Sequence, residues 1–148
     1  MILKIREYHP KDKNQVIQMM TTTIQSVNSK DYDQSQINVW SAIDPKRWDA
    51  GLTNYLALVA IQNNQIVGFT DMDLSGYLDQ LFVDRNYQRQ GIARQLVTTL
   101  EKRSPAASFS SFASITARPF FEAMGYHVVK KHIAELRSET FINYFMIK

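Results

Sequence analysis

Residues 77–103 read YLDQLFVDRNYQRQGIARQLVTTLEKR, and this stretch predicts a short strand, a polar loop and a long amphipathic helix. The segment Tyr77–Val83 is rich in β-branched and aromatic residues and is largely apolar on both alternating faces. Such a pattern is typical of a central strand that is covered on two sides, and Asp79 is the exception in it. From Ile92 onward apolar residues recur at helical spacing, so one face of this helix is expected to pack on the sheet.

The loop before this helix lacks the usual helix cap. Residues 87–90 contain no Ser, Thr, Asp or Asn, so the backbone N–H groups of the first helical turn need another partner. An exposed helix N-terminus attracts anions, and Gly91 lets a bulky phosphate approach the backbone. Arg85, Arg89 and Arg94 add positive charge around the same point. The pattern predicts a cradle for a pyrophosphate, and the alternative is an ordinary glycine turn with surface arginines.

The composition sets broad limits on the protein. Its 148 residues suit a single domain, 1–148, and the absence of cysteine excludes disulfides, thiolate metal sites and cysteine nucleophiles. No segment approaches the ~18 apolar residues of a membrane span, and the N-terminus is charged, so we expect a cytoplasmic protein without a membrane partner. The three histidines lack metal-site spacing, and we expect no bound metal. The net charge of +3 is spread along the chain, which does not favour a nucleic-acid partner.

The periodicity of the whole chain predicts the element order β-α-α-β-β-β-α-β-α-β-β. The expected strands are 2–8, 56–62, 65–74, 77–83, 108–115, 126–136 and 140–147. Asn63 and Asn64 tolerate positive φ and predict a tight hairpin. The sheet is expected to be antiparallel up to the long helix, and residues 108–115 then return as a parallel partner of the central strand. The prediction is a mixed α/β (α+β) fold.

Several motifs resemble one protein family. Gln88-x-x-Gly91-x-Ala93 directly after a strand matches the Q/R-x-x-G-x-G/A motif of the GNAT superfamily of N-acyltransferases. Residues 116–126 are similar to the family segment A-x-x-F-Y/F-x-x-x-G-F/Y, and residues 31–48 resemble a bacterial branch of uncharacterised single-domain members. The element order is also that of the family. The resemblance therefore implies a mostly antiparallel sheet of six to seven strands with helices on both faces.

The resemblance implies direct transfer of the acetyl group of acetyl-CoA to a primary amine of a small molecule, peptide or protein. In the family, the pantetheine arm pairs with the backbone of the central strand, the pyrophosphate lies on the loop and helix amides, and the short helix walls the thiol end. The residues that the resemblance assigns to acetyl-CoA are Leu81, Phe82, Val83, Gln88, Arg89, Gln90, Gly91, Ile92, Ala93, Arg94 and Phe120.

An amine nucleophile must lose a proton, so a base with a pKa near the working pH is useful. Asp79 is the candidate, because it lies on the central strand near the expected acetyl group, where apolar surroundings raise a carboxyl pKa. Asp71 and Asp73 are weaker alternatives. The structural alternative is that Asp79 only forms hydrogen bonds to a neighbouring strand.

In many family members a tyrosine on the short helix protonates the leaving thiolate. Phe121 occupies that position here, so the usual general acid is absent. The remaining candidates are water, Tyr144 and Tyr126, and both tyrosines have an alternative role in core packing.

By family resemblance, the first two helices recognise the acceptor. Tyr32 and Trp40 are the candidate substrate-binding residues. Together with Trp48 and four carboxylates they can form an aromatic, acidic mouth for a cationic amine: Asp31, Asp33, Asp44 and Asp49. The alternative is that these rings are core and these acids are solvated surface. Competing functions are a non-catalytic acyl-CoA-binding module and, less favoured, a nucleic-acid-binding domain, and the resemblance also allows a homodimer.

Overall fold

The fold is taken from a computed structural model that describes residues 2–51 and 56–148. Its strands are β1 (Lys4–Glu7), β2 (Leu56–Gln62), β3 (Gln65–Met72), β4 (Tyr77–Val83), β5 (Ser110–Ser114), β6 (His127–Leu136) and β7 (Glu139–Ile147). Its α-helices are α1 (Lys13–Ser26), α2 (Gln34–Ser41), α3 (Pro45–Gly51), α4 (Ile92–Arg103) and α5 (Arg118–Ala123). Short 3-10 turns are η1 (Pro10–Asp12), η2 (Asn28–Lys30) and η3 (Arg85–Tyr87).

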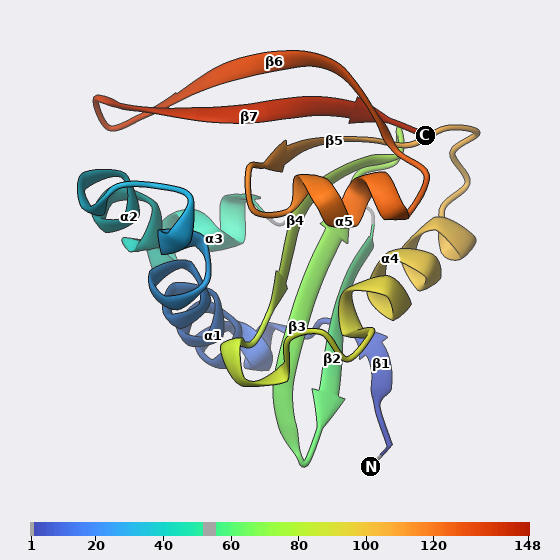
Figure 1. Ribbon diagram of the computed structural model, residues 1–148. Helices are drawn as coiled ribbons and strands as arrows, with labels where there is room; N and C mark the ends of the chain where they lie inside the picture. The colour runs from blue at the N-terminus through green and yellow to red at the C-terminus, as the bar shows by residue number, and fades with distance from the viewer. Residues whose placement is uncertain (1, 52–55) are drawn as a thin grey trace.

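The seven strands of the described ranges form one mixed sheet in the order β1-β2-β3-β4-β5-β7-β6. All neighbouring pairs are antiparallel except β4 and β5, which are parallel. Helices α1 to α3 lie on one side of the sheet, and α4 and α5 lie on the other (Figure 1). The predicted fold class and the predicted parallel partner are therefore confirmed. Among helices in the described part of the chain, none combines the length and apolar character needed to cross a membrane.

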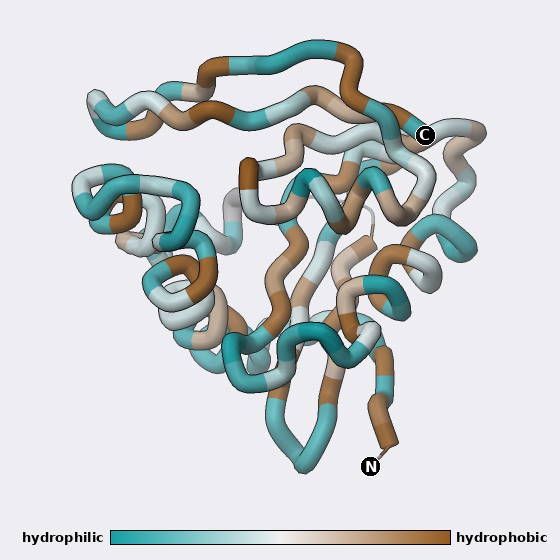
Figure 2. Tube along the Cα trace, viewed as in Figure 1, coloured by the Kyte–Doolittle hydropathy of each residue, from teal (hydrophilic) through white to brown (hydrophobic). Residues whose placement is uncertain are grey.

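Both faces of the sheet bury apolar side chains, as the apolar central strands predict. The core under α4 and α5 includes Leu58, Leu96 and Met146, each without exposed surface. Val16 and Phe69 anchor the core under α1 and α3, again fully buried. Figure 2 shows apolar segments along the central strands and a polar β2–β3 turn. A sheet covered on both faces is held rigidly, which fixes the position of β4.

The β2–β3 turn and the packing of α4 follow from single residues. Asn63 and Asn64 have φ of 54° and 60°, so the predicted tight hairpin is confirmed. At Gly68 in the middle of β3, a Cβ atom would lie 2.9 Å from Leu96 Cδ1 of α4. The missing side chain lets α4 lie close against the sheet.

The parallel pair β4 and β5 separates after two residues. Tyr77 pairs with Ser110 and Leu78 with Ser111, and beyond this point β4 remains paired with β3 and β5 with β7. Asp79 is the first residue of β4 past the separation. It is also the extra residue of a β-bulge, since β3 pairs with Leu78 and then directly with Gln80. This bulge accounts for an acid in an otherwise apolar strand.

Candidate active site

A cavity of about 970 Å³ lies where β4 and β5 separate, and we call it the fork cavity. One part of its wall comes from the β4–α4 loop, the first turn of α4, and α5. The other part comes from α1, α2, α3 and the β6–β7 turn. The exposed edge of β4 and the first residues of β5 run between these parts. The cavity therefore connects a loop suited to anions with a separate wall built from helices.

The edge of β4 offers backbone groups to the fork cavity. The Asp84 N–H donates to Val67 O of β3 at 2.8 Å, and Phe82 is paired with Phe69 on the same strand. Since backbone groups alternate along a strand, the N–H groups of Leu81 and Val83 turn toward the gap left by β5. Phe82 contributes its ring rather than its backbone. An extended ligand can add to this edge as a further strand.

The side chain of Gln88 ties the loop to the end of β4. Its Nε2 donates to Val83 O at 2.6 Å and to Asp84 O at 3.3 Å. The hydroxyl of Thr23 from α1 also donates to Val83 O, at 3.2 Å. These bonds occupy the Val83 carbonyl and leave its N–H as the group available to a ligand. They also fix where the loop starts.

The loop then turns so that α4 begins with unpaired amides. Arg89 and Gly91 have φ of 60° and 81°, and Gly91 precedes the helix without a side-chain cap. The first amide of α4 bonded to a backbone carbonyl is that of Gln95, which donates to Gly91 O at 3.0 Å. A Cβ at Gly91 would meet nothing within 4 Å, so the space beside this residue is open, and Gly91 and the first residues of α4 line the cavity. Uncapped amides at a helix start are the groups that the predicted cradle needs to hold an anion.

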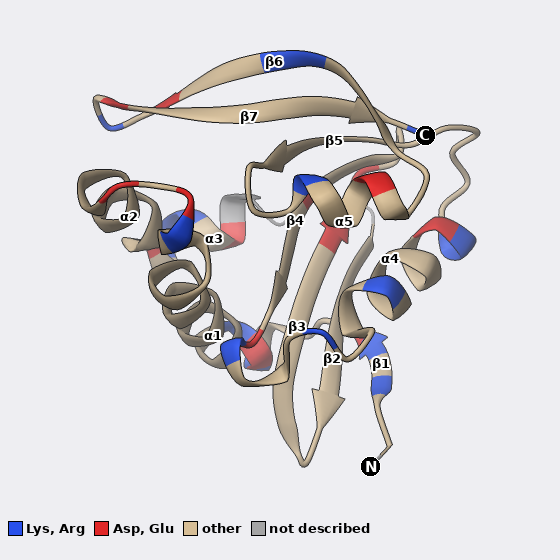
Figure 3. Ribbon diagram, in the orientation of Figure 1, with Lys and Arg blue, Asp and Glu red and all other residues tan. Residues whose placement is uncertain are grey.

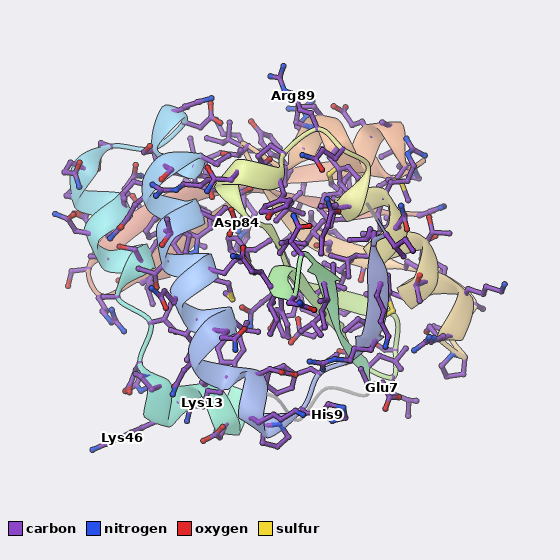
Figure 4. The ribbon with its side chains drawn as sticks, turned by 90° about the horizontal axis from the view of Figure 1, so that it is seen from below. Glu7, His9, Lys13, Lys46, Asp84 and Arg89 are labelled. Carbon is purple, nitrogen blue, oxygen red and sulfur yellow. The ribbon has the colours of Figure 1, made fainter. Side chains whose placement is uncertain are left out.

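Positive side chains surround the loop. Arginine segments lie along it and on the first turn of α4 (Figure 3). Arg89 and Arg94 are exposed and line the fork cavity, and the Arg89 side chain projects away from the body of the protein (Figure 4). Arg85 instead donates from Nη1 to Ser26 Oγ of α1 at 3.3 Å. Arg89 and Arg94 are thus the two arginines that line the cavity beside the loop, and their side chains can pair with an anionic ligand there.

Asp79 presents its carboxyl group to the fork cavity. The side chain is exposed to the cavity, but the cavity walls enclose it. This enclosure raises the pKa of the Asp79 carboxyl, and the negative charge of Asp73 raises it further. A carboxylate with a raised pKa is a better proton acceptor than an ordinary one.

The two other carboxylates considered from the sequence have structural contacts. Asp71 is fully buried and its Oδ1 accepts from the Gln80 N–H at 2.9 Å. Asp73 Oδ1 accepts from the Ser75 hydroxyl at 2.6 Å and from the Tyr77 N–H at 3.0 Å. Burial tends to raise the pKa of Asp73, but the hydrogen bonds from Ser75, Tyr77 and Gly76 outweigh it and hold the pKa below its usual value. Of these three, Asp79 is the one that lines the cavity.

Helix α5 contributes two phenylalanines to the cavity lining, one half-buried and one almost fully buried in the core. Phe120 is half-buried and lines the cavity. Phe121 is 2% exposed, and its ring centroid lies 5.4 Å from that of Phe120 and 5.1 Å from that of Tyr126. The Tyr126 hydroxyl donates to Glu101 Oε2 at 2.7 Å. The Tyr144 ring packs under the Arg118 guanidinium at 4.4 Å, and both tyrosines lie outside the cavity lining.

The two candidate substrate-binding residues have different positions. Trp40 is half-buried and lines the fork cavity, with its ring centroid 6.2 Å from that of Phe82. Tyr32 is 8% exposed, and its hydroxyl donates to Ile142 O at 2.8 Å and accepts from the Ile115 N–H at 2.9 Å. Tyr32 therefore supports Trp40 from behind, at a centroid distance of 5.3 Å, and does not line the cavity.

The acids expected around this wall are held by local contacts. Asp33 caps α2, Asp49 forms an ion pair with Lys13, Asp31 accepts from Thr116, and Asp44 accepts from the Lys46 N–H. Of these carboxylates, Asp44 alone lines the fork cavity. The expectation of an acidic mouth is therefore not supported by the structure.

Phe112 and Arg137 are two of the lining residues that the sequence did not predict. Phe112 of β5 follows the last residue paired with β4 and lines the cavity. It is the single large side chain in a strand of Ser and Ala, which is the signal that could have identified it. Arg137 of the β6–β7 turn donates from Nη1 to Val39 O and Ala42 O at the end of α2. This contact joins segments about a hundred residues apart, so no local pattern predicts it.

Comparisons with known proteins agree on one family. A family model described as an acetyltransferase (GNAT) domain matches residues 28–143. An uncharacterized N-acetyltransferase of Escherichia coli K12, YafP, is 38% identical over 144 residues, which covers 97% of this chain and 94% of that protein. The crystal structure of a GCN5-related N-acetyltransferase from Rhodopseudomonas palustris superimposes with a TM-score of 0.93 at 26% identity, covering 100% of this chain and 98% of that one. PaiA N-acetyltransferase from Thermoplasma acidophilum, solved in complex with coenzyme A, has a similar fold, with a TM-score of 0.74 at 17% identity, covering 100% of this chain and 99% of that one.

Proposed function

This chain belongs to the GNAT family of acetyltransferases, and we propose that it transfers the acetyl group of acetyl-CoA directly to a primary amine of a small molecule or a peptide. The observation that carries the proposal is the fork cavity, in which the open edge of β4 leads into the amide cradle of α4. Family membership favours an enzyme over a non-catalytic acyl-CoA-binding module. Acetyl-CoA supplies the activated acyl group.

The residues present fit acetyl-CoA. The N–H groups of Leu81 and Val83 can pair with the amides of the pantetheine arm. The amides of residues 89–94 can hold the pyrophosphate, with the guanidinium groups of Arg89 and Arg94 beside them. Phe120 walls the cavity where the thioester is expected. We assign no metal to the site, and within the described residues no cluster of His, Asp or Glu has metal-binding geometry.

Asp79 is the general base of the proposed reaction. Its carboxylate lies where β4 separates from β5 and accepts a proton from the acceptor ammonium, so that the nitrogen lone pair is free to attack. The new bond joins this nitrogen to the acetyl carbon, and the bond between that carbon and the CoA sulfur breaks. Since Tyr126 and Tyr144 lie outside the cavity lining, we propose that water returns a proton to the leaving thiolate.

Thermal unfolding with acetyl-CoA tests cofactor binding. Saturation at about 100 times the dissociation constant should add roughly 2.7 kcal/mol to the free energy of unfolding, which raises the Tm of a chain of this size by roughly 5–10 °C. Free CoA should act similarly, whereas ATP and ADP should have little effect because they lack the pantetheine arm. No shift at millimolar acetyl-CoA would contradict the proposal. Turnover is then measured as thiol release with an amine, and the chain adds no background because it has no cysteine.

Replacing Gln88 by alanine should weaken acetyl-CoA binding. The substitution removes the two hydrogen bonds that tie the loop to β4, so the loop is less ordered in the free protein. Part of the free energy of acetyl-CoA binding is then used to order it. We expect the dissociation constant to rise roughly tenfold, which corresponds to about one lost hydrogen bond. Titration calorimetry measures it. Gln95→Ala is the matched control, because Gln95 is an exposed glutamine of α4 outside the cavity lining, and equal affinities of the two variants would refute the role of Gln88.

A further inference from the structure

The separation of β4 from β5 brings a carboxylate and an aromatic ring to the same point. Leu78 and Ser111 are the last paired residues, so Asp79 and Phe112 are the first residues past the separation on each strand. Both line the fork cavity. A ligand in this cavity can therefore meet both the Asp79 carboxylate and the Phe112 ring.

The Phe112 ring is held in place by other rings. Its centroid lies 4.8 Å from that of His132, 4.9 Å from that of Phe145 and 6.1 Å from that of Tyr77. These three residues lie outside the cavity lining, so they support the ring from behind. A ring fixed in this way offers a preformed apolar surface to a ligand, and little ordering entropy is lost on binding.

Two more rings, those of Phe82 and Trp40, line the same cavity. Phe82 lies three residues further along β4, and Trp40 of α2 packs edge-on to it at 6.2 Å. Phe82 and Trp40, like Phe112, are only half-buried and line the cavity. The cavity that Asp79 lines is therefore also lined by three partly exposed aromatic rings, those of Phe112, Phe82 and Trp40.

The charged side chains on the helix wall of the fork cavity disfavour a second ammonium group on the acceptor. Within the described residues, the charged side chains that line it besides Asp79 are Asp44, Arg47 and Arg137. Asp44 already accepts from the Lys46 N–H at 2.9 Å and lies 3.9 Å from the Arg47 guanidinium. An acceptor with several ammonium groups would place the others beside two guanidinium groups and one engaged carboxylate.

We infer that the acceptor is a monoamine whose ammonium group lies at Asp79 and whose apolar, preferably aromatic, body packs against Phe112, Phe82 and Trp40. A polyamine is the disfavoured class. The inference rests on the proposed function and deepens it, since it names the substrate class of the same cavity. The protonated amine is stabilised by the carboxylate and by the faces of the rings. Burial of the apolar body away from water adds to the binding free energy.

The test compares amines within each protein variant. Thiol release with propylamine, 2-phenylethylamine, putrescine and spermidine gives a kcat/KM for each. In the wild type, 2-phenylethylamine should exceed propylamine by roughly tenfold or more, and both polyamines should be poorer than 2-phenylethylamine. The ratio of two amines does not depend on the fraction of folded enzyme, so it separates recognition from stability.

Variants of the aromatic wall should change this ratio. Phe112→Ala is expected to bring the ratio of 2-phenylethylamine to propylamine close to one, while Phe109→Ala should preserve it. Phe109 is a half-buried phenylalanine that does not line the cavity, so it is a matched control. If Phe112→Ala does not fold, Phe82→Leu replaces it, with a smaller expected drop in the same ratio.

The outcomes separate the inference from the proposed function. Preference for a polyamine, or an unchanged ratio in both wall variants, overturns the inference while acetyl transfer to amines stands. Release with none of these amines, together with no thermal shift by acetyl-CoA, overturns the proposed function and the inference with it. A thermal shift without release from any monoamine overturns the inference alone.

Discussion

Asp79→Asn is expected to lower kcat roughly 100-fold or more while acetyl-CoA affinity stays within about twofold, as is typical for loss of a general base. Asparagine has nearly the same shape as aspartate but cannot accept the ammonium proton. The cofactor residues lie along the β4 edge and the α4 loop, so the substitution leaves them in place. Thiol release measures kcat, and titration calorimetry measures the affinity. Equal loss of both would show that Asp79 supports the fold of the site rather than its chemistry.

The pH dependence gives an independent test of the same role. A general base acts in its deprotonated form, so activity falls as pH drops through its pKa. The pKa of Asp79 is raised by the enclosing walls and then by Asp73, so this loss should occur at higher pH than for an ordinary carboxyl group. The acceptor amine also titrates, and its contribution cancels in the ratio of wild type to Asp79→Asn. This ratio should fall at low pH, and a ratio that is constant with pH would contradict the assignment.

Asp73→Asn is the matched control for these measurements. It removes a negative charge that raises the pKa of Asp79, so the acid limb of the wild-type profile should move to lower pH. It also weakens the turn in which Ser75 and Tyr77 donate hydrogen bonds to the Asp73 carboxylate, so the free energy of unfolding should decrease. Turnover at high pH should be preserved, because Asp73 does not line the cavity.

The strand, loop and helix of residues 77–103 were predictable because their signals are local. The β-branched and aromatic content identifies β4, the apolar spacing identifies α4, and the lack of a capping residue points to open amides. The structure has each of these features, including a left-handed Gly91. The residues of such a motif determine its backbone conformation, since a turn and a helix start depend on few residues outside them.

The point where β4 and β5 separate was not predictable in the same way. That Asp79 lies on a bulge, with Phe112 beyond the last pair across from it, depends on the register of strands that are far apart in the sequence. Aromatic spacing also does not tell which ring reaches a cavity. Trp40 lines it, whereas the Tyr32 hydroxyl is used to join Ile115 and Ile142. Tertiary contacts decide such roles, and the sequence encodes them only through the whole fold.

Gly76→Ala is expected to destabilise the protein by roughly 3 kcal/mol or more, since it combines a steric clash with left-handed strain. Gly76 has φ of +94°, and a Cβ there would lie 2.3 Å from Ser108 O and 2.8 Å from Ala106 Cβ. Its carbonyl accepts from the Ser110 N–H at 3.1 Å, so backbone on both sides must move. A loss of this size lowers the Tm of a chain of this length by roughly 6–12 °C, which calorimetry resolves.

Gly91→Ala provides the comparison that isolates the clash. Gly91 also has positive φ, +81°, but a Cβ there would meet no atom within 4 Å. Only left-handed strain remains, and the cost should be about 1–2 kcal/mol. For acetyl-CoA affinity the order should reverse. Gly91→Ala should weaken binding more than Gly76→Ala, because its added methyl group enters the open space beside the first amides of α4. Equal loss of stability in the two variants would show that the backbone at the start of β4 shifts at little cost. The strands at the fork cavity would then not hold Asp79 in a fixed position.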